Sequence, residues 1–405
     1  MPTRYGRSPW VDWFPKSRIP SYPRHRGPLT IDVAIIGGGL TGCFTAYACA
    51  AAGVKAALFE AGRIGQGSSA SSAGWLADDP GASFAEVGRV LGLRAARHAW
   101  RSWRRAALDA AALLKRLEIK CRLEPSTALR TATSPEEVAW LKREQKARKA
   151  AGLDTAAVSA RVIAEETALM ASAALRSRDG ATLDPYRAAL GLTSAALARG
   201  AVVFEQSPVL KITFTRRTAD LFTGEGTIRA RRIIVATGMP TPLFKALARH
   251  FWFHRTYRAL TEPLPARVRR QLGVRAAVIR DVNRPPHLVR WVDGERLLIA
   301  GADGGLLPER LREKTIVQRT GQLMYELSTM YPEISGTVPS HGWDAAYART
   351  ADGLPVIGPH RNFPHHLFAF GDASPGVTGS YLASRILLRH HLGEAEAADD
   401  LFGFR

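Results

Sequence analysis

The stretch "IDVAIIGGGLTGCFTAYACAAAGVKAALFEAGR", residues 31–63, passes from an apolar run through a cluster of glycines into an alanine-rich segment and a second apolar run. Residues 31–36 are apolar and β-branched, which is typical of a strand buried on both faces. Residues 40–52 predict a helix, and residues 54–59 predict the next strand. This order predicts a βαβ unit and therefore an α/β fold of the Rossmann type.

The glycines Gly37, Gly39 and Gly42 have the spacing G-x-G-x-x-G. The first permits a tight turn, the second lets a pyrophosphate approach the backbone, and the third lets the helix pack closely on the strand. The N–H groups at the start of that helix point at the phosphates. Glu60 ends the second strand, where a carboxylate can accept hydrogen bonds from a ribose diol. Together these features predict a dinucleotide site rather than a purely structural turn.

The composition sets limits on the class of protein. The chain has 405 residues, of which 46% are hydrophobic, and no uninterrupted apolar run approaches the ~20 residues that span a bilayer. The basic N-terminus lacks a hydrophobic signal core, so we expect no transmembrane segment and a cytoplasmic location. Cys43, Cys49 and Cys121 fit neither a disulfide framework nor a metal-ligand spacing, so we expect small buried side chains and no metal.

The formal net charge of +20 raises nucleic acid or a membrane surface as a partner. The basic residues, however, are spread along the whole chain and are mostly arginine. In the helix that we expect over residues 84–120, Arg97, Arg101, Arg104 and Arg105 fall on one polar face, which is typical of a solvated face. The pattern therefore favours a solvated surface, and RNA binding is kept as an alternative that rests on charge alone.

Two segments outside the glycine-rich unit have their own patterns. The first 29 residues contain six prolines, with Trp10, Trp13 and Phe14 between them. This composition predicts an extended arm without a helix, docked through its aromatic side chains. The segment "SPEEVAWLKREQKARKA", residues 134–150, predicts a surface helix that begins with a capping box formed by Ser134 and Glu137.

Three further segments present strands that end in turns. Residues 200–212 ("GAVVFEQSPVLKI") predict a strand, a turn and a strand, and residues 230–238 ("ARRIIVATG") predict a buried strand ending in small residues. Residues 366–393 ("HLFAFGDASPGVTGSYLASRILLRHHLG") predict a strand, a glycine-rich loop and a long helix. Their strand ends can line one cofactor together with the first glycine turn.

In this order, the motifs resemble the FAD-dependent oxidoreductases of the D-amino-acid oxidase superfamily, and within it the gamma-glutamylputrescine oxidase branch. The matching pieces span about residues 30–400 and are "DVAIIGGGLTGCFTAY", "EAGRIGQGSSASSAGW", "ATLDPYRAALGLTSAALARGAVVFEQSPV", "IIVATG", "TEPLP", "RTADGLPVIGP" and "FGDASPGVTGS". The resemblance implies FAD as the cofactor. We expect it to be held without a covalent bond, because residues 65–76 and 371–380 contain neither cysteine nor histidine.

The resemblance also implies which residues hold FAD. Glu60 would hold the adenosine ribose, Arg63 would lie at the adenine side, and Val209 would clamp the adenine through its backbone. The full set of expected cofactor-binding residues is Gly37, Gly38, Gly39, Leu40, Thr41, Gly42, Glu60, Ala61, Arg63, Gln66, Gly67, Ser68, Ser69, Ser72, Ala73, Gly74, Trp75, Val209, Ala236, Thr237, Gly238, Gly371, Pro375, Gly376, Val377 and Thr378.

The chain departs from the family pattern at two loops. Residues 72–75 (Ser-Ala-Gly-Trp) stand where this branch usually has an Asn-Gly-Gly turn, and residues 372–375 replace the more usual histidine and glycine run. The flavin surroundings and the role of the second loop are therefore left open. Trp75 is either part of the pocket or a packed core aromatic.

The implied fold is α/β: a discontinuous Rossmann-like FAD-binding domain with an inserted substrate domain built on a mixed or antiparallel sheet. We expect an arm over residues 1–29 and a tail over 393–405. The FAD-binding domain would take residues 30–82, 150–240 and 344–392, and the substrate domain 83–149 and 241–343. In this family the substrate enters between that sheet and the flavin.

The implied reaction is oxidation of a C–N bond in a small amine or amino acid, in which a hydride moves to flavin N5 and the imine hydrolyses in water. Oxygen or another acceptor would reoxidise the flavin. Candidate pocket residues are Tyr257, Arg258, His287, Arg290, Trp343 and Tyr347, although each could equally face the core or solvent.

A planar guanidinium binds a carboxylate bidentately, so we expect an arginine as substrate anchor, with Arg290 slightly ahead of Arg258. Alternation places Arg290 on one face with Leu288 and Val292. Two other functions stay open: a flavoprotein acting on a modified base in RNA, and a non-catalytic FAD-binding subunit of a larger complex.

Overall fold

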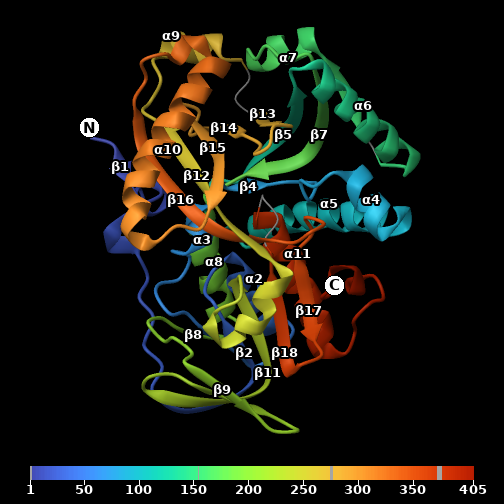
Figure 1. Ribbon diagram of the computed structural model, residues 1–405. Helices are drawn as coiled ribbons and strands as arrows, with labels where there is room; N and C mark the ends of the chain where they lie inside the picture. Colours follow the sequence, from blue (N-terminus) through green and yellow to red (C-terminus); the bar gives the residue numbers. More distant parts are fainter. Residues whose placement is uncertain (1, 154, 274–276, 372–375) are drawn as a thin grey trace.

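The computed structural model of the chain describes residues 2–153, 155–273, 277–371 and 376–405. Its strands form two sheets, which occupy the lower and upper halves of Figure 1. The first sheet has the order β17-β18-β11-β2-β3-β8, and the hairpin of β9 and β10 extends β11. Its strands are β2 (Gly27–Ile36), β3 (Ala56–Phe59), β8 (Val202–Phe204), β9 (Lys211–Phe214), β10 (Ala219–Phe222), β11 (Gly226–Gly238), β17 (Val356–His360) and β18 (Phe363–Phe370).

The βαβ unit expected at residues 31–59 is confirmed: β2 and β3 are parallel neighbours in the sheet, and helix α2 (Leu40–Ala51) connects them along the chain. Helix α2 packs between α8 (Pro185–Leu197) and α11 (Gly376–Leu392). On β2, Val33 and Ile35 belong to the hydrophobic cluster that includes residues of these helices, whereas Ala34 and Ile36 belong to the cluster on the opposite face. Both faces are covered, which explains why the run is continuously apolar.

The second sheet has the order β1-β16-β12-β15-β14-β13-β5-β7-β4, with β6 paired to β7. Most neighbours are antiparallel, but β13 pairs with β5 and β1 with β16 in parallel, so the sheet is mixed, as expected. Its strands are β1 (Arg4–Tyr5), β4 (Trp75–Leu76), β5 (Glu124–Ala132), β6 (Ala156–Ser159), β7 (Ala173–Thr182), β12 (Trp252–Thr261), β13 (Ala277–Asp281), β14 (Leu288–Val292), β15 (Arg296–Gly305) and β16 (Pro339–Arg349).

Helices cover the outer face of the second sheet. Helix α10 (Glu309–Met330) lies across β12, β15 and β16, and Leu323 of this helix shares a hydrophobic cluster with Tyr257 and Ile299 of the sheet. The remaining helices are α3 (Ser68–Ser71), α4 (Phe84–Leu91), α5 (Leu93–Arg116), α6 (Pro135–Ala150), α7 (Ala160–Thr167), α9 (Ala266–Gln271) and the 3₁₀ turns η2 (Pro242–His250), η3 (Pro332–Ile334) and η4 (Asp399–Phe402). Among the described residues, no helix is long and apolar enough to cross a membrane.

Two expected helices can be compared directly with the structure. The capping box of α6 is confirmed, since the Ser134 hydroxyl accepts from the Glu137 N–H and the Glu137 carboxylate accepts from the Ser134 N–H. The single helix expected over residues 84–120 is wrong. Gly92 divides it into α4 and α5, with φ of +88°, a left-handed conformation that ends the first helix.

The N-terminal arm docks on the molecule, as expected, but it is not free of helix. Helix α1 (Pro9–Asp12) begins at Pro9, a position where the missing proline N–H costs no helical hydrogen bond, and η1 (Lys16–Arg18) follows. Trp10 is buried with 2% of its surface exposed. The three cysteines are free and buried, as expected.

Sheet membership differs from the expected segments at four strands. Strands β4, β6 and β7 and residues 344–349 of β16 were placed with the FAD-binding half, but they pair within the second sheet. Strand β7 joins β5 along one edge, while β6 and β4 pair with two separate stretches of its other edge. Residues 156–182 therefore lie in the same sheet as β5, which precedes them in the sequence. The hydrophobic pattern of a strand does not name its partner, because pairing is decided by non-local contacts.

Candidate active site

A groove runs along the carboxyl ends of the parallel strands of the first sheet, where ligands of such sheets bind. Its floor is the turn after β2. Gly37 has φ of +107°, and a Cβ there would lie 2.6 Å from the Ala236 carbonyl oxygen, while a Cβ on Gly42 would lie 1.9 Å from the Gly37 oxygen. The turn therefore admits no side chain and leaves its backbone open to a close ligand, which is what a pyrophosphate needs.

Glu60 closes the groove at the end of β3. Its two carboxylate oxygens accept hydrogen bonds from the Gly38 and Gly62 N–H groups, each at 2.7 Å. Ser69 of α3 accepts from the Leu40 N–H at 2.8 Å, so the short helix is tied to the start of α2. A carboxylate fixed beside a glycine cradle and a helix N-terminus fits the ribose and phosphates of a dinucleotide such as FAD.

The structure places most of the expected cofactor residues along two connected walls. Those that line the groove are Gly37, Gly39, Leu40, Thr41, Glu60, Ala61, Gln66, Gly67, Ser68, Ser69, Val209, Ala236, Thr237 and Gly238. Those that line a second pocket, beyond the loop at residues 71–75, are Ser72, Ala73, Gly74, Trp75 and Gly376. Those that line neither are Gly38, Gly42, Arg63, Gly371, Val377 and Thr378. Pro375 lies outside the described residues.

The second pocket lies between that loop and the second sheet. On β12, His254, Thr256 and Arg258 face the pocket, as expected from alternation. Tyr257 therefore faces the other way, and its ring lies 5.9 Å from the Arg319 guanidinium on the α10 side. The remaining residues of the lining, apart from the loop, are Arg280, Pro286, His287, Leu288, Ala300, Gly301, Asp303, Tyr347 and Arg349.

Several charges in this pocket are already paired. Asp303 lies 2.7 Å from Arg349 and 3.8 Å from His254 Nε2. Burial and the nearby Arg349 lower the pKa of His254 to about 4, so this ring is neutral near pH 7. His287 lies between Asp281, 2.6 Å from Nδ1, and Glu326, 3.0 Å from Nε2.

Burial alone would lower the pKa of His287, but the hydrogen bond and the charge of Asp281, with the charge of Glu326, outweigh it and raise this pKa. Both ring nitrogens are occupied by carboxylates. His287 therefore bridges two carboxylates and has no nitrogen left to accept a proton from a substrate.

Two guanidinium groups in the pocket, those of Arg258 and Arg280, form no ion pair with a carboxylate among the described residues, although Asp79 and Asp281 act on Arg280 through their charge. Arg258 donates to the Tyr347 hydroxyl at 2.7 Å and to the Thr256 carbonyl at 3.3 Å, and its guanidinium lies 5.4 Å from the Tyr347 ring centre. One terminal nitrogen of Arg280 is buried without a hydrogen bond. Burial, together with the neighbouring Arg130, lowers the pKa of Arg280 to about 10, which still leaves it charged at pH 7. The pocket is therefore positive.

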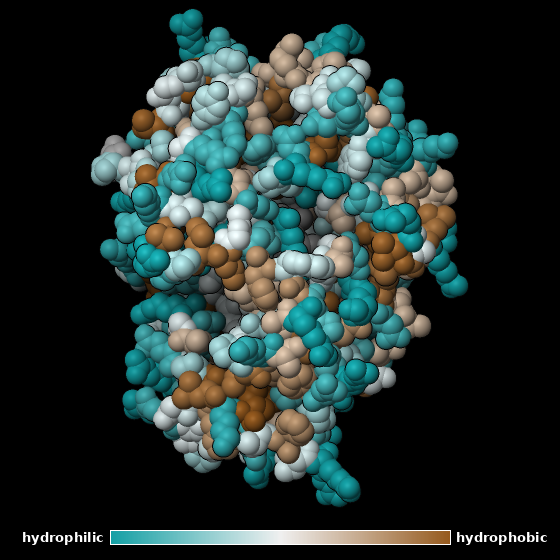
Figure 2. Space-filling model, in the orientation of Figure 1, coloured by the Kyte–Doolittle hydropathy of each residue, from teal (hydrophilic) through white to brown (hydrophobic). Residues whose placement is uncertain are grey.

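The pocket opens into an outer vestibule that shares Arg280, Pro286, Asp303 and Arg349 with it. Across this vestibule, Glu86 of α4 forms a 3.3 Å ion pair with Arg284. Arginines and carboxylates line it together: Arg130, Arg143, Arg280, Arg284, Arg349, Glu86, Glu136, Glu137, Asp281 and Asp303. Figure 2 likewise shows hydrophilic residues spread over both halves of the face seen in Figure 1, with smaller hydrophobic groups between them.

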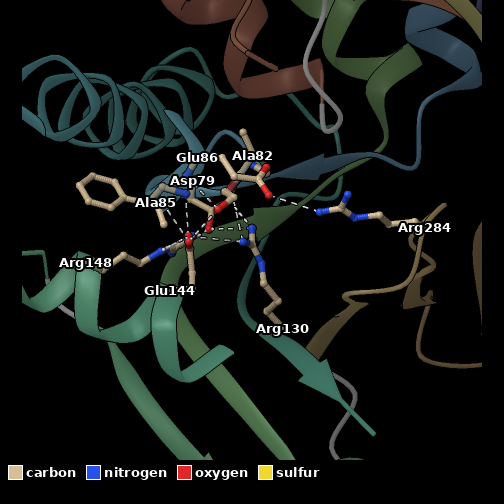
Figure 3. Close-up of polar contacts among 11 residues, drawn as sticks. Asp79, Ala82, Ala85, Glu86, Arg130, Glu144, Arg148 and Arg284 are labelled. Atoms are coloured by element: carbon tan, nitrogen blue, oxygen red, sulfur yellow. Dashed lines mark hydrogen bonds and ion pairs between the residues drawn. The ribbon is translucent and has the colours of Figure 1, made fainter. Parts of the chain in front are cut away.

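One wall of the vestibule is held by a charge network that the sequence patterns did not indicate. Arg130 of β5 and Arg148 of α6 both bind Asp79, and Arg148 also binds Glu144 at 2.9 Å (Figure 3). Burial would raise the pKa of Asp79, but the two arginines outweigh it and lower this pKa. Glu144 also accepts from the N–H groups of Phe84 and Ala85, so the network fixes the loop that leads into α4.

Arg290 and Trp343 lie on the pocket side of the second sheet, but their side chains bind the backbone of the loop at residues 71–75. The Nε of Arg290 donates to the Ala73 carbonyl at 2.6 Å, and its terminal nitrogens donate to the Leu183 and Trp291 carbonyls. The Trp343 indole donates to the Ser71 carbonyl at 2.9 Å. Arg290 lines a separate cavity behind the loop, so of the six residues expected at the substrate, the structure brings together Arg258, His287 and Tyr347.

Sequence reasoning missed five polar residues of the pocket: His254, Thr256, Arg280, Asp303 and Arg349. Counting back from Arg258 in steps of two would have found His254 and Thr256, because alternate residues of a strand share a face. Arg280 and Asp303 lie on strands whose facing could not be assigned without the strand pairing.

Comparison with known proteins agrees with this geometry. The family model described as FAD dependent oxidoreductase (DAO) matches residues 32–389. Gamma-glutamylputrescine oxidoreductase of Escherichia coli K12 is 26% identical over 379 residues, which cover 92% of this chain and 86% of that protein. Glycine oxidase of Geobacillus kaustophilus is 26% identical over 396 residues, which cover 92% of this chain and 96% of that protein.

Solved structures show the same fold. The crystal structure of glycine oxidase from Geobacillus kaustophilus superposes with a TM-score of 0.76 at 21% identity, covering 93% of this chain and 99% of that one. L-amino acid deaminase from Proteus myxofaciens superposes with a TM-score of 0.74 at 14% identity, covering 95% of each chain.

Proposed function

The chain belongs to the DAO family of FAD-dependent oxidoreductases, and from this premise we propose that it oxidises a C–N bond in a small amine or amino acid that carries an acidic group. The names of its relatives, gamma-glutamylputrescine oxidoreductase and glycine oxidase, support an amine or amino acid as substrate. The acidic group is inferred from the pocket. The observation that carries it is the pair Arg258 and Arg280, both without a carboxylate partner among the described residues.

Bound FAD supplies the acceptor for the hydride that leaves the carbon next to nitrogen. The loop at residues 72–75 forms one side of the pocket and β12 forms the other, so a substrate held there lies between the cofactor loop and the second sheet. A guanidinium that lacks an anionic partner gains most from a carboxylate, since charge-assisted bonds of this kind are about twice as strong as neutral ones. Arg258 and Arg280 are therefore the proposed substrate anchors.

The same positive charge selects the protonation state of the substrate. An ammonium group would be repelled by two unpaired guanidinium groups, whereas a neutral amine would not. The neutral form has the nitrogen lone pair that becomes the second bond of the C=N product. His254, with a pKa of about 4, is a weak base near pH 7, and both nitrogens of His287 are occupied by carboxylates. The pocket therefore favours hydride removal from a substrate that enters without its extra proton.

We propose that the two sheets have different roles, one in binding FAD and the other in binding the substrate. The first sheet provides the groove for FAD, and the second provides the roof of the substrate pocket. On this basis β4, β6 and β7 go with the substrate half, and the FAD half takes the strands of the first sheet.

Nothing in the pocket favours the other two functions. Carboxylates accompany the arginines of the vestibule, so its mouth is not the concentrated basic patch that RNA binding needs. Trp75 lines the pocket together with polar and charged residues, which does not support the blocked pocket of a non-catalytic subunit.

The test is anaerobic bleaching of the flavin absorbance by matched substrate pairs. Each amino acid of a panel is compared with its methyl ester and with the amine that lacks the carboxylate. We expect bleaching by at least one acid and at least tenfold weaker bleaching by its ester, because the ester removes the charge that the arginines bind. Admission of air then shows whether oxygen restores the colour. If dithionite bleaches the flavin but no amine or amino acid does, the proposed reaction is wrong.

A further inference from the structure

Three consecutive carbonyl groups of the loop between groove and pocket are held by side chains from distant parts of the chain. The Ser71 carbonyl accepts from the Trp343 indole at 2.9 Å, the Ser72 carbonyl from the Trp10 indole at 3.0 Å, and the Ala73 carbonyl from Arg290 at 2.6 Å. Ser71 borders the FAD groove, and Ser72 and Ala73 border the pocket. The three donors therefore fix the backbone at the boundary between cofactor and substrate.

The next residue is held as well. Gly74 has φ of +66°, and a Cβ there would lie 2.2 Å from the Leu183 carbonyl oxygen and 2.9 Å from an Arg290 terminal nitrogen. The Leu183 N–H donates back to the Gly74 carbonyl at 2.8 Å. Each of the four residues 71–74 is thus hydrogen-bonded through its carbonyl to a distant part of the chain. Only glycine fits at position 74.

Trp10 differs from the other two donors because it lies in α1 of the N-terminal arm and not on a strand of the second sheet. Its ring is buried, lies 5.2 Å from the Arg290 guanidinium and lines the cavity behind the loop, on the side away from the substrate pocket. The arm has further contacts with the molecule, since Trp13 contacts His341 and Phe14 contacts Tyr186. The hydrogen bond from Trp10 to the Ser72 carbonyl therefore forms only when the arm is docked on the molecule.

The direction of the Ser72 carbonyl fixes the direction of the next N–H. The peptide between Ser72 and Ala73 is trans, so the Ala73 N–H points opposite to the Ser72 carbonyl. Trp10 draws that carbonyl toward the cavity behind the loop, and the Ala73 N–H is therefore directed to the pocket side. The neighbouring amides are occupied, Ser72 N–H by the Ser69 carbonyl and Gly74 N–H by the Ser72 hydroxyl. The Ala73 N–H has no acceptor among the described residues.

We propose that Trp10 is a positioning residue, through which the N-terminal arm holds the Ala73 N–H as a hydrogen-bond donor to the bound flavin. A donor held in place before the cofactor arrives costs no reorganisation when charge builds up on the ring during reduction. The arm is thus part of the cofactor site although it contributes no residue to the FAD groove. The inference uses FAD binding by the family and not the identity of the substrate.

The experiment compares Trp10→Phe with Trp13→Phe in the full chain. Both changes remove one indole from the same arm, but only the first removes a hydrogen bond to the loop. Apoprotein is titrated with FAD, and the midpoint potential of the bound flavin is measured against a reference dye. For Trp10→Phe we expect the FAD dissociation constant to rise about three- to tenfold, the loss of one hydrogen bond, and the potential to fall, because the reduced ring loses a donor. For Trp13→Phe we expect neither change.

If Trp10 only packs, Trp10→Phe and Trp13→Phe should both have a lower melting temperature. The two variants should then have the same midpoint potential and the same FAD dissociation constant, and this result would overturn the proposal. A measurement on the unchanged protein covers the case in which Trp10→Phe fails to fold. Amide hydrogen exchange at Ala73 should slow when FAD binds, and unchanged exchange there would also overturn the proposal. Neither readout needs a substrate, so failure of the proposed amine oxidation would leave this test intact.

Discussion

Replacing Arg280 by methionine tests the substrate anchor most directly. Methionine keeps much of the side-chain volume and removes the charge, and the terminal nitrogen of Arg280 that lacks a hydrogen bond has no protein partner to lose among the described residues. The change should therefore affect the substrate more than the fold. Arg290 is unsuited to this test, because its nitrogens donate to the carbonyls of Ala73, Leu183 and Trp291, and its loss would disturb the loop instead.

The expected magnitude follows from the environment of the guanidinium. A unit charge 4 Å from a carboxylate is worth about 4 kcal/mol at an effective dielectric constant of 20, and a charge-assisted hydrogen bond contributes a net ~1.5–3 kcal/mol. The net range applies, because it already includes the cost of removing water from both groups. We expect kcat/KM for an acidic substrate to fall about 10- to 100-fold, and the effect on its methyl ester to stay within about threefold.

The assay is stopped-flow flavin reduction with the acid and with its ester, and the control is Arg284→Met. Arg284 lines the same vestibule, but its side chain is 81% exposed, and within the described part of the chain it pairs with the exposed Glu86 alone. Such pairs contribute about 0–1 kcal/mol, so this variant should resemble the wild type. Arg258→Met should behave like Arg280→Met. If Arg258→Met and Arg280→Met both reduce at wild-type rates with every acid that bleaches the flavin, the two arginines do not anchor the substrate.

Three further predictions concern the cofactor and the effect of pH. Glu60→Ala should raise the FAD dissociation constant by roughly 30- to 150-fold, the loss of a charge-assisted pair of about 2–3 kcal/mol, in a titration of apoprotein, and an unchanged constant would place the ribose elsewhere. The flavin should be released as FAD on acid precipitation, because residues 65–76 and 371–380 contain no cysteine or histidine to bind it, whereas colour retained in the pellet would show a covalent bond. The pKa of His254 is lowered from 6.5 to about 4 in the folded protein, so its contribution to stability is complete above pH 6.5 and is lost as pH falls toward 4. Between pH 6.5 and pH 4, the free energy of unfolding should therefore fall less steeply in His254→Gln than in the wild type, by up to about 1.4 kcal/mol per pH unit. Urea denaturation at several pH values measures this slope, and the same slope in both proteins would contradict the lowered pKa.

The sequence alone determined the parts of this protein whose chemistry is local. The turn after β2, the helix start at Leu40 and the carboxylate of Glu60 lie within 30 residues of one another, and each residue type has its own steric or electrostatic reason there. The capping box of α6 was also predictable, because Ser134 and Glu137 satisfy each other's backbone. Motif order added the family and its cofactor.

Only the tertiary structure decided which residues line the proposed substrate pocket and which strands belong to the second sheet. Alternation shows which residues of a strand share a face, but not which face looks at the cofactor, so Tyr257 and Arg258 were equal candidates until β12 was paired with β15 and β16. The sequence favoured Arg290 slightly over Arg258 and did not indicate Arg280, because what distinguishes these arginines is whether distant carbonyls already occupy their donors. The bond from Trp10 to Ser72 joins residues 62 positions apart, and no period or motif records a contact that depends on where two separate segments meet in space.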